Sequence, residues 1–374
     1  MHGLVQEFTY RRDEMVQLLR QLVELESPSN EKEAVDKLSS FLAERLQALG
    51  CEVEVIPQEQ YGNHVLASWG EGEPPILVLC HMDTVWATGE IKKRPFRVEG
   101  NKAFGPGAFD MKAGIVQAIF ALEAAQKRGL VQRRIVFLFN SDEEPGSFSS
   151  RPIIEELARK AKVALVLEPS VPPGALKTFR KGLGRFEITV KGRAAHSGAD
   201  FEKGISAIDE LARQVLKLHQ LTDLEKGTTV NVGVFQGGTR ANVVAAEARV
   251  EVDMRAATLE EAEKVVKEIL SLKPELEGTE IEVRGGLNRP PMERTPAIVE
   301  LFNHAQALAH ELGFDITEAG TGGGSDGNFT AALGVPTLDG LGAVGDGGHA
   351  VHEYVDLEYL PERTALLTRL FETL

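Results

Sequence analysis

The sequence predicts an α/β protein with a largely parallel central sheet, into which a ferredoxin-like α+β module is inserted. Three observations lead to this expectation. Up to about residue 180, strongly apolar strands alternate with helices, which is typical of a parallel sheet covered on both faces. Between about 181 and 289 the strands alternate apolar and polar residues instead. After about 290 the helix–loop–strand pattern resumes.

The first part of the chain, residues 1–180, begins with two amphipathic helices. Apolar residues recur at helical spacing over about 11–26 and 33–50, and Gly50 is suited to end the second helix. Apolar strands and helices then alternate. We expect strands at 51–58, 64–70, 75–83, 133–144 and 163–170, and helices at 114–129 and 153–162.

The module at 181–289 has the order strand, helix, two strands, helix, strand, which is that of a ferredoxin-like sandwich. Segments that contain glycine and proline mark both of its boundaries. Residues 1–180 and 290–374 should therefore form one discontinuous domain. Within the module we expect strands at 184–192, 228–238, 246–255 and 279–286, and helices at 204–221 and 259–272.

Composition excludes several classes of protein. Hydrophobic residues make up 43% of the 374, which is enough for two cores. The 41 basic and 56 acidic residues give a net charge of −15, which argues against nucleic acid or an anionic membrane as a partner. Cys51 and Cys80 are the two cysteines, so a disulfide framework is not expected. Without a secretory or membrane-spanning apolar run, we expect a cytoplasmic protein.

Ionisable side chains follow the ends of several apolar strands. The run 76–80 leads into His81 and Asp83, which project from one side of a strand because strand side chains alternate. That pair alone is equally well explained by a core histidine and a turn-capping aspartate. Further candidates are Asp110 in GPGAFDMKAG, Asp142, Glu143 and Glu144 in FLFNSDEEPGS, Glu168 in VALVLEPS, and His349 and His352 in GDGGHAVHEYV. Ligands bind at the carboxyl edge of open α/β sheets, so we expect these groups to converge there.

A convergent set of this composition points to a metal centre. Several carboxylates gathered without cations would repel one another. Imidazoles and carboxylates without a thiolate suit zinc or a similar divalent ion, and Cys80 alternates away from His81 into the core. Two metals that share a bridging carboxylate would neutralise the cluster, activate water at neutral pH and polarise a scissile carbonyl. A remaining carboxylate would serve as general base.

Five motifs, taken together and in order, resemble the co-catalytic zinc peptidase family. That family includes aminoacylases, acetylornithine and succinyl-diaminopimelate deacylases, and glutamate carboxypeptidases, and the last branch is the most similar. The motifs are HMDTV, GPGAFDMKAG, SDEEPGS, GRAAHSG and GGGSDGNF. The resemblance implies a catalytic domain with two divalent metals, most suitably Zn2+ with Co2+ or Mn2+ as alternatives, and an inserted lid that forms a homodimer.

The resemblance also implies a role for each metal-site residue. Glu143 is similar to the general base of the family, and Asp83 to the carboxylate that orients a histidine ligand. The Asp110–Met111 peptide bond is expected to be cis. The implied metal ligands are His81 and Glu168 for one ion, Glu144 and His349 for the other, and Asp110 as the bridge. His349 is preferred to His352 because Glu353 follows it at the spacing typical of the family.

Other residues resemble those that contact substrate. His196 in GRAAHSG is similar to a histidine that stabilises the tetrahedral oxyanion in a partner subunit. Without the resemblance, it reads as a turn histidine in a polar loop. Arg255, Asn242 and Lys181 resemble residues that hold a substrate carboxylate, and the alternative for Lys181 is a solvated hinge lysine. The backbone amides of Gly323, Gly324 and Ser325 in TGGGSD are expected to face the same carboxylate.

The sequence therefore predicts a zinc-dependent carboxypeptidase that cleaves the amide bond of N-acyl or N-aminoacyl amino acids, small substrates with a free carboxylate. The nearest alternative is an N-acetyl amino-acid deacetylase of the acetylornithine type. A nucleotide-binding oxidoreductase would need a G-x-G-x-x-G turn after its first strand, which is absent. A non-catalytic metal-binding protein would lack Glu143 or a metal ligand, and the sequence retains them all.

Overall fold

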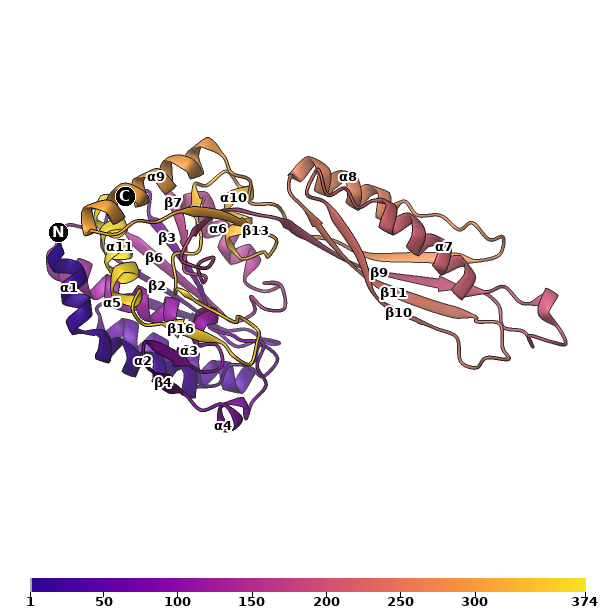
Figure 1. The fold of residues 1–374 in the computed structure, drawn as a ribbon, viewed down its shortest axis with the longest axis horizontal. Helices are drawn as coiled ribbons and strands as arrows, with labels where there is room; N and C mark the ends of the chain where they lie inside the picture. Colours follow the sequence, from indigo (N-terminus) through magenta and orange to yellow (C-terminus); the bar gives the residue numbers. More distant parts are fainter. Residues whose placement is uncertain (1) are drawn as a thin grey trace. The chain divides into compact units, whose positions relative to one another are not determined.

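The computed structural model describes residues 2–374, which form two compact units (Figure 1). The main unit contains the chain up to Phe179, then Arg294–Thr321 and Ser325–Leu374. The inserted unit contains Arg180–Glu293 and the short segment Gly322–Gly324, which the sequence analysis had placed in the discontinuous domain. No helix within residues 2–374 has both the length and the apolar character needed to cross a bilayer.

A six-stranded sheet forms the centre of the main unit. Its order is β1-β2-β6-β3-β7-β14, and β6, β3, β7 and β14 are parallel neighbours. The hairpin of β1 and β2 extends this sheet in the antiparallel sense. The strands are β1 (Glu52–Ile56), β2 (His64–Trp69), β3 (Ile76–His81), β6 (Ile135–Asn140), β7 (Val163–Val166) and β14 (Thr337–Leu338). The predicted largely parallel sheet is confirmed.

Helices cover both faces of this sheet because its strands are apolar on both sides. In β3, Ile76, Val78 and Cys80 belong to the larger core, whereas Leu77 and Leu79 belong to a smaller one. The larger core contains α1 (His2–Tyr10), α2 (Arg12–Glu24), α3 (Lys32–Ala48), α5 (Ala113–Arg128), α9 (Pro296–Leu312) and α11 (Leu360–Thr373). The smaller core is covered by α6 (Arg151–Lys160) and α10 (Gly327–Ala332).

Two small sheets were not anticipated from the sequence, because their strands are too short to show periodicity. One of them has the order β15-β16-β5-β4 and joins segments 250 residues apart in the chain. Its strands are β4 (Arg97–Glu99), β5 (Lys102–Phe104), β15 (Gly345–Asp346) and β16 (Tyr354–Asp356), with the short helix α4 (Glu90–Lys93) before them. The other pairs β8 (Leu176–Arg180) with β13 (Glu318–Thr321).

Two glycines allow backbone segments to approach the end of β7 closely. A Cβ atom at Gly114, near the start of α5, would collide with the carbonyl oxygen of Leu167. A Cβ atom at Gly342 would collide with the same oxygen and lie 2.8 Å from the carbonyl oxygen of Glu168. Larger residues at these two positions would force backbone segments apart. The backbone at Leu167, directly before Glu168, is thus held between two segments from distant parts of the chain.

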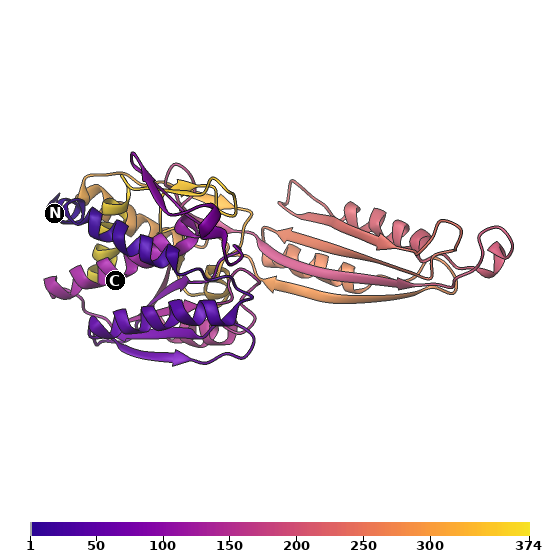
Figure 2. The same ribbon diagram turned by 90° about the horizontal axis from the view of Figure 1, so that it is seen from below.

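The inserted unit is a four-stranded antiparallel sheet with two helices on one face, and Figure 2 shows the helices behind the strands. The order β10-β11-β9-β12 and the chain order of helices and strands are those of a ferredoxin-like fold. Its elements are β9 (Gly182–Lys191), α7 (Ala207–Gln220), β10 (Thr229–Gly237), β11 (Glu247–Ala256), α8 (Leu259–Leu270) and β12 (Glu280–Arg289). The helices cover the core face of this sheet, and the other face carries the polar residues of the alternating strands.

Candidate metal centre

The parallel strands bring the predicted ionisable residues to one edge of the central sheet. His81 ends β3, Glu143 and Glu144 follow β6, and Glu168 follows β7. These three strands are adjacent and point the same way, so their carboxyl ends meet. Asp110 lies in the kinked segment Ala108–Lys112 that leads into α5, where the backbone angles of Asp110 and Met111 are not helical, and the Asp110–Met111 peptide bond is cis, as expected.

Asp110 lies between the two imidazoles. Its Oδ1 is 3.1 Å from Nε2 of His81, and its Oδ2 is 3.3 Å from Nε2 of His349. His81 Nε2 is also 3.5 Å from Oε1 of Glu168, and His349 Nε2 is 3.1 Å from Oε2 of Glu144. Each imidazole therefore shares Asp110 and has one further carboxylate of its own.

The donor atoms are close enough together to hold metal ions. Possible ligand atoms of His81, Asp110 and Glu144 lie within 4.8 Å of one another, and so do those of His81, Glu143 and Glu168. Oε1 of Glu144 is buried and has no hydrogen-bond partner among residues 2–374. A buried carboxylate oxygen needs a donor or a cation, so this orphaned atom fits a metal ligand. Imidazole nitrogens together with carboxylate oxygens are ligands that suit zinc or a similar ion.

Burial and hydrogen bonds raise the pKa values of one carboxylate and both imidazoles in this cluster. Burial raises the pKa of Glu144 to about 7. Hydrogen bonds with Asp110 and Glu144 raise the pKa of His349 to about 11. Burial lowers the pKa of His81, but its hydrogen bonds with Asp110 and Asp83 outweigh burial and raise that pKa well above the usual value. Without metal, protons on the imidazoles thus neutralise the carboxylates.

Asp83 contacts the His81 ring mainly through its backbone carbonyl, whereas its carboxylate was expected to make this contact. Nδ1 of His81 is 2.9 Å from the backbone carbonyl oxygen of Asp83 and 3.6 Å from its carboxylate. The main orienting contact is thus the carbonyl, and an Nδ1–H donor to it leaves Nε2 facing Asp110. The carboxylate accepts the backbone N–H groups of Glu143 and Glu144 at 3.2 and 3.3 Å, and the hydroxyl of Ser29 at 2.7 Å.

The carboxylate of Asp83 therefore positions the loop after β6, a role that spacing alone did not indicate. Ser29 was missed by sequence reasoning, because a serine after a helix gives no signal of its own. Asp142 closes the same loop. Its Oδ2 accepts the backbone N–H and the hydroxyl of Ser149 at 2.6 and 2.8 Å. Of the three acidic residues after β6, Asp142 thus serves the loop, whereas Glu143 and Glu144 lie among the possible ligands.

His349 and His352 are separated by the structure. His349 contacts Asp110 and Glu144, as given above, and has a positive φ of 63°, which is uncommon outside glycine. His352 is exposed, and its side chain forms no ion pair with an acidic residue among residues 2–374. The geometry therefore supports the choice of His349.

His196 and Asn242 lie together in the inserted unit. The segments pair at His196 and Val243, and the backbone N–H of Ser197 donates to the carbonyl of Asn242 at 3.1 Å. Nδ1 of the exposed His196 accepts the backbone N–H groups of Gly198 and Ala199, both at 3.1 Å. An accepting Nδ1 places the proton of the neutral ring on Nε2. His196 can therefore present an N–H donor to a ligand.

The glycine segment Gly322–Gly324 is held by two arginines. Arg255 donates to the carbonyl of Gly322 at 3.1 Å and is also bidentate on Asp253, with Nε–Oδ1 and Nη2–Oδ2 distances of 2.8 and 3.0 Å. Arg180 donates to the carbonyls of Gly323 and Gly324 at 3.3 and 2.9 Å. These contacts explain why Gly322–Gly324 packs with the inserted unit.

Of the predicted substrate residues in this part of the chain, Ser325 stands apart from the others. Ser325 is fully buried in the main unit, where its backbone N–H donates to Asn328 at 2.9 Å and its hydroxyl to Asp339 at 2.5 Å. Both donors are used within the chain, so this geometry does not offer Ser325 to a substrate. Lys181 is partly buried in the inserted unit, where it joins β8 to β9.

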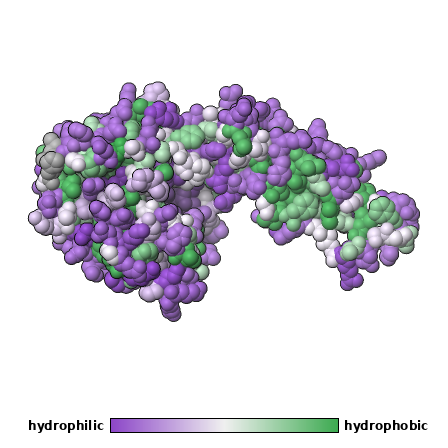
Figure 3. Space-filling model, viewed as in Figure 1, coloured by the Kyte–Doolittle hydropathy of each residue, from purple (hydrophilic) through white to green (hydrophobic). Residues whose placement is uncertain are grey.

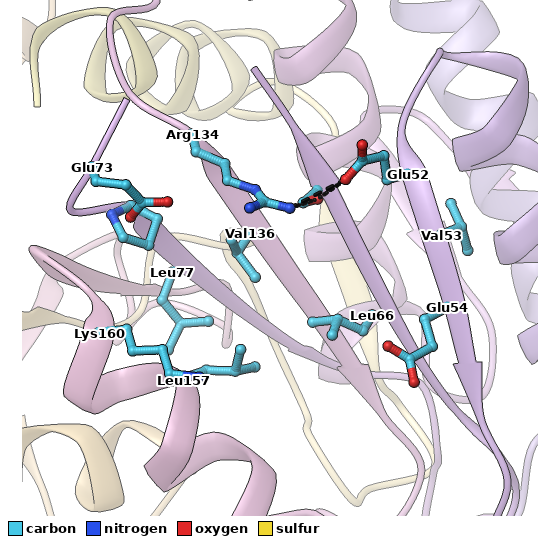
Figure 4. A pocket seen from close by; sticks show the side chains of 12 residues that line it. Glu52, Val53, Glu54, Leu66, Glu73, Leu77, Arg134, Val136, Leu157 and Lys160 are labelled. Carbon is cyan, nitrogen blue, oxygen red and sulfur yellow. Dashed lines mark hydrogen bonds and ion pairs between the residues drawn. The ribbon is translucent and has the colours of Figure 1, made fainter. Parts of the chain in front are cut away.

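A groove elsewhere on the main unit lacks this chemistry. Figure 4 shows a hollow of about 350 Å³ on the face of the central sheet that carries α6. Leu77 and Val136 line it near the amino ends of β3 and β6, away from the carboxyl edge, and Arg134 within it is paired with Glu52 at 3.2 Å. No histidine lines this groove.

Comparison with known proteins identifies relatives over nearly the whole chain. The family model described as Peptidase family M20/M25/M40 matches residues 77–373. Carboxypeptidase G2 of Pseudomonas sp. (strain RS-16) is 31% identical over 376 aligned positions, which cover 98% of this chain and 91% of that protein. Acetylornithine deacetylase of Klebsiella pneumoniae (strain 342) is 28% identical over 262 positions, 64% of this chain and 67% of that protein.

Solved structures share the fold at lower sequence identity. A tripeptidase from Staphylococcus aureus superimposes with a TM-score of 0.80 and 21% identity, and the match covers 97% of this chain and 99% of the other. At that level of identity, the likeness concerns the fold.

Addition of Zn2+ to metal-free protein at pH 7 should release between two and three protons per molecule, because the raised pKa values keep both imidazoles protonated and Glu144 about half protonated, and metal ligands must be deprotonated. As pH rises toward the pKa of His349, fewer protons must be displaced, so proton release should fall and apparent affinity should rise. Calorimetry in buffers of different ionisation enthalpy measures both quantities.

The His349→Ala variant should bind one metal ion fewer than the parent, and the His352→Ala variant should bind as the parent does. Zn2+ uptake without proton release would contradict this account.

Proposed function

The chain belongs to peptidase family M20/M25/M40, and on this premise we propose that it is a two-metal carboxypeptidase that removes glutamate or a similar amino acid from N-acyl or N-aminoacyl substrates. Membership of the family makes it a hydrolase. The observation that carries the finer proposal is Asp110, which offers one oxygen to His81 and the other to His349. Similarity to carboxypeptidase G2 over 98% of the chain supports the carboxypeptidase branch.

The proposed ligands are His81 and Glu168 for one ion, Glu144 and His349 for the second, and Asp110 for both. The distances between their donor atoms, 3.1–3.5 Å, support this assignment. Zn2+ suits the donor set best, and Co2+ or Mn2+ could replace it. When bound, the metal pair supplies Lewis acidity at the scissile carbonyl and a nucleophilic water at neutral pH.

Glu143 is the proposed general base. Its carboxylate oxygen lies within 4.8 Å of donor atoms of His81 and Glu168, and its backbone N–H is held by Asp83. In this role, Glu143 removes a proton from the attacking water and then delivers it to the nitrogen of the leaving amine. Asp83 keeps Glu143 and Glu144 in register because its carboxylate binds both of their backbone N–H groups.

His196 is the proposed donor to the oxyanion that forms at the attacked carbonyl. Its Nδ1 accepts two backbone N–H groups, which leaves Nε2–H as the free donor of the neutral ring. Asn242 lies on the segment that pairs with His196 through Val243, and it is proposed to contact the substrate carboxylate. Arg255, Lys181 and the N–H groups of Gly323 and Gly324 complete this proposed subsite. Three of the five N–H donors of Arg255 are already engaged, which leaves two for a substrate.

A second copy of this chain is the proposed partner of the inserted unit. The nine-residue strand β10 forms an open edge of the sheet, where unpaired backbone groups favour pairing with another strand. Val234 and Phe235 are 36% and 42% exposed on this strand, and Phe201 and Ile208 lie exposed on nearby segments. Figure 3 shows hydrophobic surface on the inserted unit.

We propose that the enzyme acts in the cytoplasm. Its two cysteines, Cys51 and Cys80, are buried and form no disulfide, which fits a reducing compartment.

An N-acetyl amino-acid deacetylase is the alternative that the relatives favour next, since an acetylornithine deacetylase is 28% identical over 64% of the chain. Both activities use the same metal centre and general base. They differ in which side of the amide bond the inserted unit recognises. A substrate panel therefore separates them.

Zn2+-loaded protein should release glutamate from folate or from N-acyl-glutamates, and a chelator should abolish this release. The panel would add acetylornithine and simple dipeptides, with amine release as the measurement. Cleavage of acetylornithine alone would retain the metal mechanism but reassign the enzyme to the deacetylases. Absence of hydrolysis across the panel, with two ions bound, would overturn the carboxypeptidase proposal.

Glu143→Gln should lower kcat by roughly 10²–10⁴-fold, the usual contribution of a general base, while two metal ions remain bound. Metal content by atomic emission and kcat under saturating substrate measure the two effects separately. Glu156→Gln, which alters an exposed glutamate on α6, is the matched control and should leave both unchanged. Equal loss of metal and activity in Glu143→Gln would mean that Glu143 is a ligand instead.

His196→Ala should lower kcat by roughly 10²–10³-fold, as loss of one oxyanion donor does. If His196 acts in the partner subunit, mixing His196→Ala with Glu143→Gln should restore about a quarter of parental activity after subunit exchange, because half of the dimers then carry one complete site. Sedimentation of the parent measures the dimer. An active monomer with no complementation would refute a role across subunits.

A further inference from the structure

We propose that Glu353 is a positioning residue that locks the loop of Asp110 to the loop of His349 and so sets the spacing of these two candidate metal ligands. The inference rests on the metal centre proposed above. Glu353 lies four residues after His349 and is 1% exposed. It contacts the backbone around Asp110 and does not extend into the cluster of candidate ligands.

Four N–H donors converge on the carboxylate of Glu353. Oε1 accepts the backbone N–H groups of Phe109 and Asp110, at 2.9 and 3.1 Å. Oε2 accepts the backbone N–H of Gly107 at 2.9 Å and the indole N–H of Trp86 at 3.0 Å. Only an ionised carboxylate accepts two donors at each oxygen. Three of the four donors belong to the segment that carries Asp110.

The short strands β5 and β16 bring Glu353 to this position. Their antiparallel register pairs Tyr354, the first residue of β16, with Phe104, the last residue of β5. Glu353, directly before β16, therefore lies beside the segment that follows β5 and leads to Asp110. Gly347, before His349, has φ of 82°, and a Cβ atom there would lie 2.9 Å from the backbone nitrogen of Glu353. The loop from Gly347 to Glu353 is therefore tightly folded on itself, with His349 at its turn.

A second set of contacts fixes the same loop from outside. Arg94 stacks on the ring of Trp86, with its guanidinium carbon 4.0 Å from a ring centroid. Arg94 also donates to the carbonyl of Val351 at 3.1 Å. Trp86 in turn donates to Glu353, so both the middle and the end of the His349 loop are tied to the segment after β3. No contact in this set involves a candidate metal ligand directly.

Loss of the negative charge on Glu353 should therefore change the separation between Asp110 and His349 while the protein remains folded. In Glu353→Gln, one oxygen can keep two donors, but the new NH₂ group faces the other two N–H groups and cannot accept them. Residues that hold metal ligands typically change affinity by roughly 10–100-fold when altered. The ion held by His349 and Glu144 should be affected most, because His349 sits on the loop that Glu353 anchors.

The test is titration of metal-free parent and variant proteins with Co2+, followed by its visible absorption. In Glu353→Gln, affinity for one of the two ions should fall by roughly 10–100-fold, with an altered Co2+ spectrum. Glu210→Gln is the matched control. Glu210 is equally buried and accepts backbone N–H groups of Glu275 and Leu276, but it lies in the inserted unit. It should lose stability with both Co2+ affinities unchanged.

Parental affinity and spectrum in Glu353→Gln would overturn the inference, as would an equal change in Glu210→Gln. If Glu353→Gln does not fold, Trp86→Phe decides, since it removes one of the four donors. A weaker second Co2+ affinity in Trp86→Phe supports the role, and an unchanged one refutes it. A parent protein that binds no Co2+ would instead refute the proposed metal centre, so the two failures are distinguishable.

Discussion

The charge balance around Asp110 is the constraint on which the rest of the structure depends. Carboxylates from three separate segments meet two imidazoles in a partly buried volume at the edge of one sheet. Such a cluster is stable only if cations, whether protons or metal ions, offset its negative charge. In the metal-free molecule, the raised pKa values of His81 and His349 mean that both imidazoles carry a proton that offsets negative charge. The buried oxygen of Glu144 that lacks a hydrogen-bond partner likewise needs a cation or a donor.

The framework around this cluster consists largely of backbone groups held by buried carboxylates. Asp83 binds the N–H groups of Glu143 and Glu144, and Glu353 binds the N–H groups around Asp110. A buried carboxylate that accepts several N–H groups fixes a loop in one conformation, because each lost bond would leave a polar group unpaired. The loops of this site, which carry the candidate ligands, are therefore more rigidly defined than their lack of regular structure suggests.

The two units divide the candidate functions between them. The main unit contains the ligand cluster and the proposed base, whereas His196, Asn242 and Arg255 belong to the inserted unit. This division matches their local chemistry. Strand ends of a parallel sheet gather ionisable groups at one edge. The inserted antiparallel sheet offers an exposed imidazole with a defined tautomer and guanidinium groups that hold a glycine segment.

The sequence by itself determined the fold class, the insertion and the identity of the residues that gather at the sheet edge. Strands such as β3 and β6 are apolar up to their last residue, and His81 ends β3 while Glu143 and Glu144 follow β6, so local pattern was sufficient. Only the tertiary structure decided how these residues are held. The roles of Asp83, Ser29 and Glu353 depend on hydrogen bonds to backbone atoms distant in the chain, and Gly322–Gly324 joins the inserted unit through arginine contacts. Backbone N–H and carbonyl groups are the same in every residue, so a sequence does not reveal which of them a buried side chain will bind.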